Sequence, residues 1–104
     1  MVKIISFDGE ELLLRKESYE HDKTLAITAE SPNGEPYANF TVNLDVPFLE
    51  HNEQFFNINM FKGKEILELL IAESIVVTTG YESQSGFVTY PLVKWNFEEE
   101  NNGI

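Results

Sequence analysis

Cysteine is absent from this 104-residue chain. Its absence excludes a disulfide framework, a zinc site built on thiolates and a cysteine nucleophile. Basic side chains are scarce, because 7 Lys and Arg stand against 18 Asp and Glu and the formal net charge is −11. Such a charge repels nucleic acid and anionic lipid and attracts a basic protein surface. We therefore expect a protein partner with a basic surface and no direct nucleic-acid binding, although acidity also serves solubility alone.

Long apolar segments are missing as well. Residues 1–7 form an apolar run that is too short for a signal peptide, and the apolar cluster at residues 69–72 has acids on both sides. Neither approaches the roughly 20 apolar residues of a membrane-spanning helix. The lack of cysteine suits a reducing compartment. The sequence therefore predicts a cytoplasmic protein that does not enter a membrane.

The apolar content is still sufficient for one folded domain. Hydrophobic residues make up 42% of the chain and aromatic residues 12%, and a chain of this length should bury about 60–70% of its unfolded surface. We expect a single domain over residues 1–97. The polar segment 98–104 is predicted to be a flexible tail.

Period-two alternation of apolar and polar residues is widespread and predicts β-structure. Asp8-Gly9 and Asn33-Gly34 are turn signals that tolerate positive φ, and each lies between two extended segments, so we expect two antiparallel hairpins. The clearer hairpin pairs residues 24–30 with residues 37–44. Extended segments are predicted at residues 2–7, 12–14, 24–30, 37–44, 74–79 and 87–97, with a further short one at 55–59 after a loop.

One segment has helical spacing. Residues 64–73 (KEILELLIAE) have apolar side chains at helical spacing. The broad face consists of Ile66, Leu67, Leu70, Ile71 and Ser74, and the side chains that point toward water are Glu65, Glu68 and Glu73. We therefore expect an α+β fold, a mainly antiparallel twisted sheet of about five to six strands with one packed helix.

Residues 80–86 (GYESQSG) have the glycines and serines of a catalytic or phosphate-binding loop. A phosphate cradle leads into a helix N-terminus, whereas this segment leads into the extended segment 87–97. It therefore predicts a hairpin connection. Ser83 and Ser85 have no G-x-S-x-G setting, so we expect no catalytic residue and no enzymatic activity.

His21 and His51 are the only histidines. Each lies in a predicted loop beside acids, but the two have neither the i,i+4 pairing nor the short fixed interval of a metal-binding motif. We interpret them as solvated loop side chains and expect no metal site and no cofactor.

Partner binding has two sets of candidate residues. Carboxylates two apart on a strand project from one face about 6.6 Å apart, an interval comparable to that between phosphates on an extended nucleic-acid strand. Acids on a pleated scaffold can therefore imitate a polyanion. Aromatic side chains of the C-terminal hairpin, such as Tyr90 and Trp95, mainly suit the core and are also favoured at interface centres. The candidate contacts are Glu30, Glu35, Glu82, Trp95, Glu98, Glu99 and Glu100.

Two segments resemble paired motifs of a known family. They are NGEPYANFTVNL at residues 33–44 and SGFVTYPL at residues 85–92. The family consists of small uncharacterised proteins encoded on plasmids, conjugative elements and phages of Firmicutes and Bacteroidetes, and the resemblance covers about residues 24–97. It implies no enzymatic activity and transfers no catalytic residue. Residues 80–84 depart from the pattern, because family members usually have more polar residues before S-G.

The mobile-element setting, the small size and the acidity are also similar to those of anti-CRISPR proteins that inhibit type II-A Cas9. The resemblance implies a non-enzymatic inhibitor that occupies the basic surface of Cas9 and blocks loading of guide RNA or DNA. The alternative is an accessory or regulatory protein-binding module of a mobile genetic element, which would use the C-terminal aromatic hairpin. The sequence indicates no oligomeric state.

Overall fold

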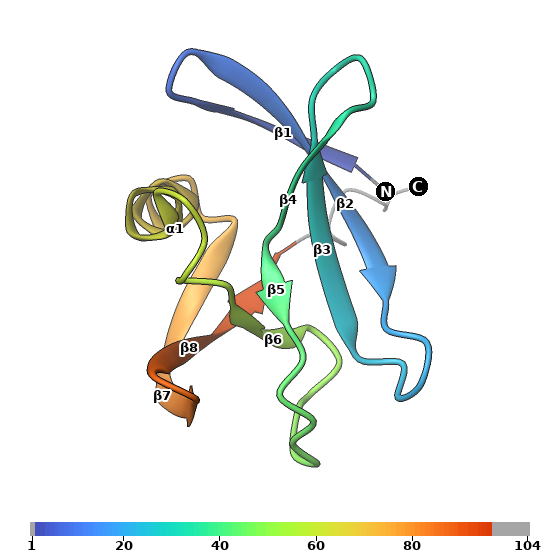
Figure 1. Cartoon of the computed structure of the whole chain (residues 1–104), viewed down its shortest axis with the longest axis vertical. Coiled ribbons are helices and arrows are strands. Elements are labelled where there is room, and N and C mark those ends of the chain that lie inside the picture. The colour runs from blue at the N-terminus through green and yellow to red at the C-terminus, as the bar shows by residue number, and fades with distance from the viewer. Residues whose placement is uncertain (1, 97–104) are drawn as a thin grey trace.

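A computed structural model describes residues 2–96, and Figure 1 shows their arrangement. The strands form two four-stranded sheets, in the orders β1-β2-β3-β4 and β5-β6-β8-β7, with antiparallel pairing throughout. The α+β class with one helix is confirmed, but the expectation of five to six strands in one sheet is wrong. The elements are β1 (Val2–Phe7), β2 (Glu10–Ser18), β3 (Leu25–Glu30), β4 (Pro36–Asn39), β5 (Thr41–Val42), β6 (Glu53–Phe56), α1 (Gly63–Ala72), β7 (Val76–Ser85) and β8 (Val88–Trp95).

The chain passes from the first sheet to the second at Phe40. Its backbone N–H donates to the carbonyl of Ile27 at 2.8 Å, and its own carbonyl accepts from Asn57 N at 2.9 Å. Phe40 is fully buried, and the next residue, Thr41, is buried as well. The segment predicted as one strand over 37–44 is therefore two strands, because the bend at Phe40 interrupts the alternation and redirects the chain.

The predicted hairpins are present. The β1–β2 turn places Asp8 at φ 56° and Gly9 at φ 81°, both on the positive side that a two-residue hairpin turn requires. In the second hairpin, β3 pairs with β4 from Thr28 opposite Asn39 to Glu30 opposite Pro36, with a register shift after Ala29.

The C-terminal hairpin is also confirmed, but its loop is shorter than expected. β7 runs to Ser85, so most of residues 80–86 is strand and the connection to β8 is short. A register shift in β7 surrounds Gly80, which has φ 87°. Pro91 lies beside this irregularity, and the pairing of β8 with β6 begins only at Leu92. The missing N–H of Pro91 therefore breaks no ladder on that side, in agreement with the rule that confines proline to bulges and edges.

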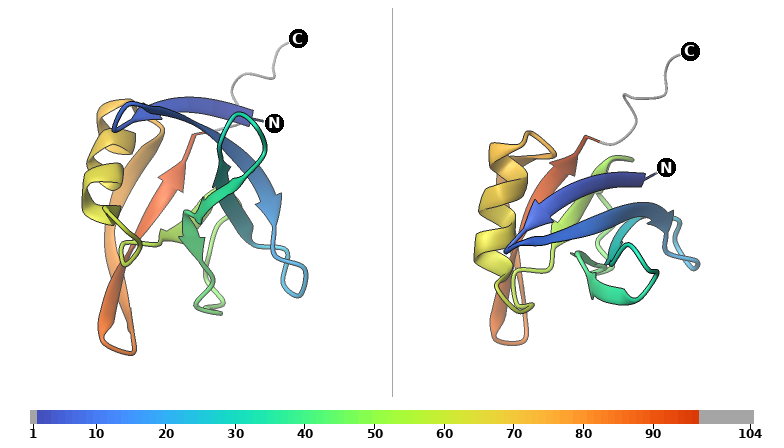
Figure 2. Two further views of the ribbon diagram at one scale, coloured as in Figure 1. Left: turned by 45° about the horizontal axis from the view of Figure 1, so that its top comes forward. Right: turned by 90° about the horizontal axis from the view of Figure 1, so that it is seen from above.

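The helix α1 closes one side of the core. Its Ile66 and Leu70 are buried, as the spacing predicts, and Gly63 is buried as well. Ile71, expected on the same face, is 42% exposed. Figure 2 shows α1 beside the second sheet, with the tip of the β1–β2 hairpin next to it. An ion pair joins them, because Lys62 Nζ lies 2.9 Å from Asp8 Oδ2. The common core contains Ile5, Leu12, Leu14, Leu25, Ile27, Ala29, Phe40, Phe56, Ile66, Leu70, Ile75, Val76, Val93 and Trp95.

Trp95 belongs to this core. It is 1% exposed, and its ring lies 6.4 Å from that of Phe56. This burial corrects the expectation that Trp95 offers its ring to a partner, because a partner could reach it only by opening the core.

Candidate functional site

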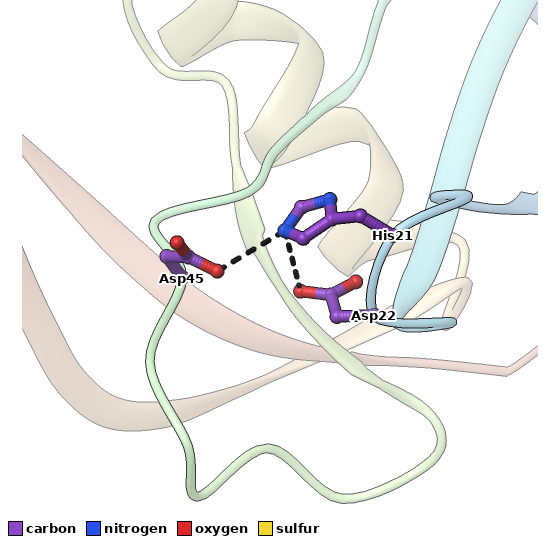
Figure 3. A group of neighbouring side chains, drawn as sticks. All are labelled: His21, Asp22 and Asp45. Atoms are coloured by element: carbon purple, nitrogen blue, oxygen red, sulfur yellow. Dashed lines mark hydrogen bonds and ion pairs between the residues drawn. The ribbon is translucent and has the colours of Figure 1, made fainter.

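Two loops bring a histidine and two carboxylates together. His21 and Asp22 lie between β2 and β3, and Asp45 lies between β5 and β6, more than twenty residues along the chain. Figure 3 shows the three side chains pointing toward one another. His21 Nε2 lies 3.2 Å from Asp45 Oδ1 and 3.5 Å from Asp22 Oδ2. We call these three residues the His21 cluster.

Hydrogen bonds fix the carboxylate of Asp22 and the backbone at Asp45. Asp22 Oδ1 accepts from the backbone N–H of Thr24 at 3.1 Å and from its hydroxyl at 2.9 Å, and Asp22 Oδ2 accepts from Asn43 Nδ2 at 3.0 Å. The same Asn43 accepts the backbone N–H of Asp45 through its Oδ1 at 2.9 Å. Asn43 therefore links the carboxylate of Asp22 to the backbone of Asp45, and the β2–β3 and β5–β6 loops are held as one unit.

The charges in the His21 cluster stabilise one another. The hydrogen bond to Asp45, followed by the charge of Asp22, raises the pKa of His21 above its ordinary value of 6.5. The hydrogen bond from Asn43, followed by the backbone N–H of Thr24, lowers the pKa of Asp22 to about 2. Both effects favour an imidazolium between two carboxylates.

The same donor atoms could also be considered as metal ligands. One ligand atom from each residue lies within 4.8 Å of the others, and imidazole nitrogen with carboxylate oxygen suits zinc-like ions. However, the oxygens of Asp22 already accept three hydrogen bonds, and an ion would have to displace the proton of His21. We therefore interpret the His21 cluster as a set of ion pairs that holds the two loops together. His21 is exposed, as predicted, but it is paired and not simply solvated.

An open groove of about 540 Å³ adjoins the cluster. It runs between the β2–β3 region and the β5–β6 loop, and its walls include Lys16, Lys23, Leu49 and His51. The side chains that line the groove are acidic, basic, polar and apolar. This mixture points to no reaction type, because a catalytic pocket requires a few polar groups that converge on one point.

The predicted partner contacts lie far apart. Glu30 is ion-paired, with its Oε2 2.6 Å from Arg15 Nη2. Glu35 is exposed in the β3–β4 turn, and Glu82 is exposed on β7. This turn and the far end of the β7–β8 hairpin occupy opposite ends of the molecule (Figure 1). The structure therefore does not assemble the three acids into one site. Glu98, Glu99 and Glu100, with the rest of the predicted tail 98–104, lie outside the described residues.

The acids of residues 2–96 lie at the surface, since none of them is buried. They do not, however, form the ladder expected on a strand. No described strand carries two acids two residues apart; the acids on strands are Glu10, Glu11, Glu17, Glu30, Glu53 and Glu82. Regular imitation of a phosphate backbone by one described strand is therefore wrong, and any polyanionic surface must combine side chains from several elements.

The fold and its surface define a small α+β domain with strongly negative charge and, within residues 2–96, no helix with the length and apolarity that crossing a bilayer requires. The chain belongs to the family described as "Domain of unknown function (DUF4313)", whose model matches residues 13–102. This membership confirms the resemblance to a family of uncharacterised proteins. No curated protein and no solved structure matches the chain.

The ion pairing of the His21 cluster should be visible as a histidine titration. We expect NMR to give His21 a pKa above 6.5, and Asp45→Asn to move that pKa down, whereas Glu50→Gln should leave it unchanged. The stabilising effect of protonated His21 is present below pH 6.5 and disappears as the pH rises through its raised pKa. That of Asp22 is present above its ordinary value of 3.8 and disappears as the pH falls toward 2. A His21 pKa that is insensitive to Asp45→Asn would contradict the ion pair between His21 and Asp45.

Proposed function

We propose that this protein is a non-enzymatic inhibitor that binds the basic surface of a nucleic-acid-handling enzyme of host defence. Surplus negative charge supports this function most directly. Even if each of the 7 basic side chains neutralised one of the 18 acids, 11 acids would remain without a counterpart. The named form of the proposal is an anti-CRISPR protein that binds Cas9 and blocks loading of guide RNA or DNA.

We assign partner binding to the surface around the start of α1. Lys62 is ion-paired with Asp8 in the β1–β2 turn and also feels the charge of Glu65 in the first turn of the helix. The ion pair places Asp8 of the turn beside the start of the helix. We call this surface the turn–helix patch; its exposed members are Asp8, Glu10, Glu11, Glu65 and Glu68.

The chemistry of the turn–helix patch lets the protein compete with nucleic acid for the enzyme. A nucleic-acid-binding enzyme presents Lys and Arg side chains to phosphates, and carboxylates on a rigid domain can occupy the same side chains. Long-range attraction accelerates the encounter of oppositely charged surfaces and weakens with added salt. The protein itself needs no catalytic group for this effect.

Cleavage by Cas9 in the presence of the protein tests the named form. We expect excess protein added before guide RNA to suppress DNA cleavage, and the variant E10Q/E11Q/E65Q/E68Q to lose at least about tenfold in potency, since each removed contact in a charged interface costs a fraction of a kcal/mol or more. The matched control E17Q/E20Q/E50Q/E53Q removes the same charge at positions that are not candidate contacts and should lose much less. Full Cas9 activity with excess wild-type protein would contradict inhibition of Cas9.

The alternative function, an accessory protein-binding module, is supported by a different observation. Phe87 is fully exposed at the tip of the β7–β8 hairpin, and large aromatic side chains are favoured interface anchors. Phe87→Ala should abolish partner binding under this alternative and leave it unchanged if the turn–helix patch is the binding region. Pull-down of the partner with Phe87→Ala and with E10Q/E11Q/E65Q/E68Q distinguishes the two proposed functions.

A further inference from the structure

The second sheet has an aromatic outer face. Phe55 and Leu92 are 0% and 5% exposed but lie outside the common core, and they face each other across β6 and β8. The ring of Tyr81 lies 6.4 Å from that of Phe55 and 5.3 Å from that of Phe48. Tyr81 therefore covers Phe55, and Phe48 packs against Tyr81; the two side chains remain 46% and 49% exposed.

This face continues along the sheet. Val77 is opposite Lys94 in the pairing of β7 with β8, and Glu53 is opposite the same lysine in the pairing of β6 with β8. Residues directly opposite one another share a face of the sheet, and so do residues two apart on one strand. Val77, which is 50% exposed, therefore extends the aromatic face. We call Phe48, Val77 and Tyr81 the outer patch.

The charge of this region differs from that of the rest of the chain. By strand register, the charged residues on the outer face of β6, β7 and β8 are Glu53 and Lys94, and their charges cancel. A basic partner is attracted to the acidic surfaces and gains no attraction here. An identical copy, which is equally acidic, meets no net charge on the strands of this face.

We propose that the outer patch is the contact between two copies of this chain in a symmetric dimer. A two-fold axis places the same patch on both sides of the contact, so the half-exposed rings and Val77 of one copy cover those of the other. The face also carries one charge of each sign, Lys94 and Glu53, which a two-fold arrangement can pair between copies. This inference concerns assembly and does not depend on the proposed inhibition.

Salt should act on this dimer in the direction opposite to its action on a charged complex. Added salt screens the repulsion between two chains of net charge −11 and leaves the apolar contact in place. The dimer is therefore expected to tighten with salt, whereas binding to a basic partner weakens. The sign of the salt effect distinguishes the two interactions.

Sedimentation equilibrium of the full chain tests the dimer. We expect a concentration-dependent dimer whose dissociation constant falls severalfold from low to high salt. Val77→Glu should give a monomer at all concentrations, and Tyr81→Ser, which removes apolar area without adding charge, should weaken the dimer at least about tenfold. Ile71→Glu places the same type of change at a 42% exposed position on α1 and should leave the dimer unchanged.

The outcomes separate folding from assembly and assembly from inhibition. Trp95 fluorescence and circular dichroism report whether each variant is folded. A wild-type chain that sediments as a monomer at every concentration in high salt would overturn the dimer, and so would folded Val77→Glu and Tyr81→Ser variants that dimerise as well as the wild type. The variant E10Q/E11Q/E65Q/E68Q should keep the dimer even where it loses inhibition.

Discussion

Replacing Phe56 with alanine is expected to lower the free energy of unfolding by about 3–5 kcal/mol, the range for aromatic residues removed from a core. Phe56 is fully buried, and its ring lies 6.1 Å from that of Phe40 and 6.4 Å from that of Trp95. It connects the residue at which the chain changes sheets with the end of β8. The change leaves a cavity where both sheets meet, so the loss includes contacts that relaxation cannot restore.

Phe87→Ala is the matched control for this substitution. It deletes the same ring from a side chain that is fully exposed at the hairpin tip, and the expected change is within about 0.5 kcal/mol. Urea unfolding followed by the fluorescence of Trp95, the only tryptophan, measures both variants. Because domains of this size have total stabilities of about 5–15 kcal/mol, Phe56→Ala should unfold at much lower urea. Equal midpoints for the two variants would contradict the assignment of the core.

Gly63→Ala is expected to cost about 1–3 kcal/mol or more, the range for atoms forced into a filled site. Gly63 is the first residue of α1 and is buried. A Cβ placed there would lie 2.9 Å from the carbonyl carbon of Ile58 and closer still to its oxygen. These are backbone atoms, so relief requires the start of the helix or the preceding loop to move.

Lys64→Ala is the control for Gly63→Ala. Lys64 follows Gly63 in the helix and is exposed, and alanine is an excellent helix former. The expected change in the free energy of unfolding is therefore within about 0.5 kcal/mol. Thermal unfolding followed by circular dichroism compares the two. A Gly63→Ala variant as stable as the wild type would show that the close approach of α1 to Ile58 is not required.

Local signals explain why much of the fold could be predicted. The hairpin at Asp8-Gly9 depends on a few neighbouring residues, and the helix depends on the spacing of Ile66 and Leu70. The transition at Phe40 has no such signal, because the alternation of residues 37–44 is compatible with one continuous strand. The segment is divided because its first part, β4, pairs with β3 and its second part, β5, pairs with β6. Two sheets could therefore not be distinguished from one.

The candidate site was less accessible to sequence reasoning. His21 and Asp45 come from separate loops, and only the folded chain brings them within hydrogen-bonding distance. The one local signal was the Asn43-Leu44-Asp45 segment, whose side-chain-to-backbone hydrogen bond is a common turn feature of asparagine. Aromatic count likewise could not separate Trp95, which is buried, from Tyr81, which is half exposed, because a bulge in β7 decides the position of Tyr81.

Surface charge spread over several elements also changes the form of the functional hypothesis. Imitation of a phosphate ladder would require regular spacing, and the described strands do not provide it. A patch built from the β1–β2 turn and α1 requires only that both elements stay together. The ion pair of Lys62 with Asp8 meets that requirement, and the core beneath α1 keeps its position fixed.

The association rate constant of the protein with purified Cas9, measured as a function of salt, tests the central claim most directly. If negative charge drives binding, the rate constant should fall steeply between low and high salt, by about tenfold or more, and E10Q/E11Q/E65Q/E68Q should show a shallower dependence. A rate constant that stays the same across the salt range, for wild type and variant alike, would contradict it.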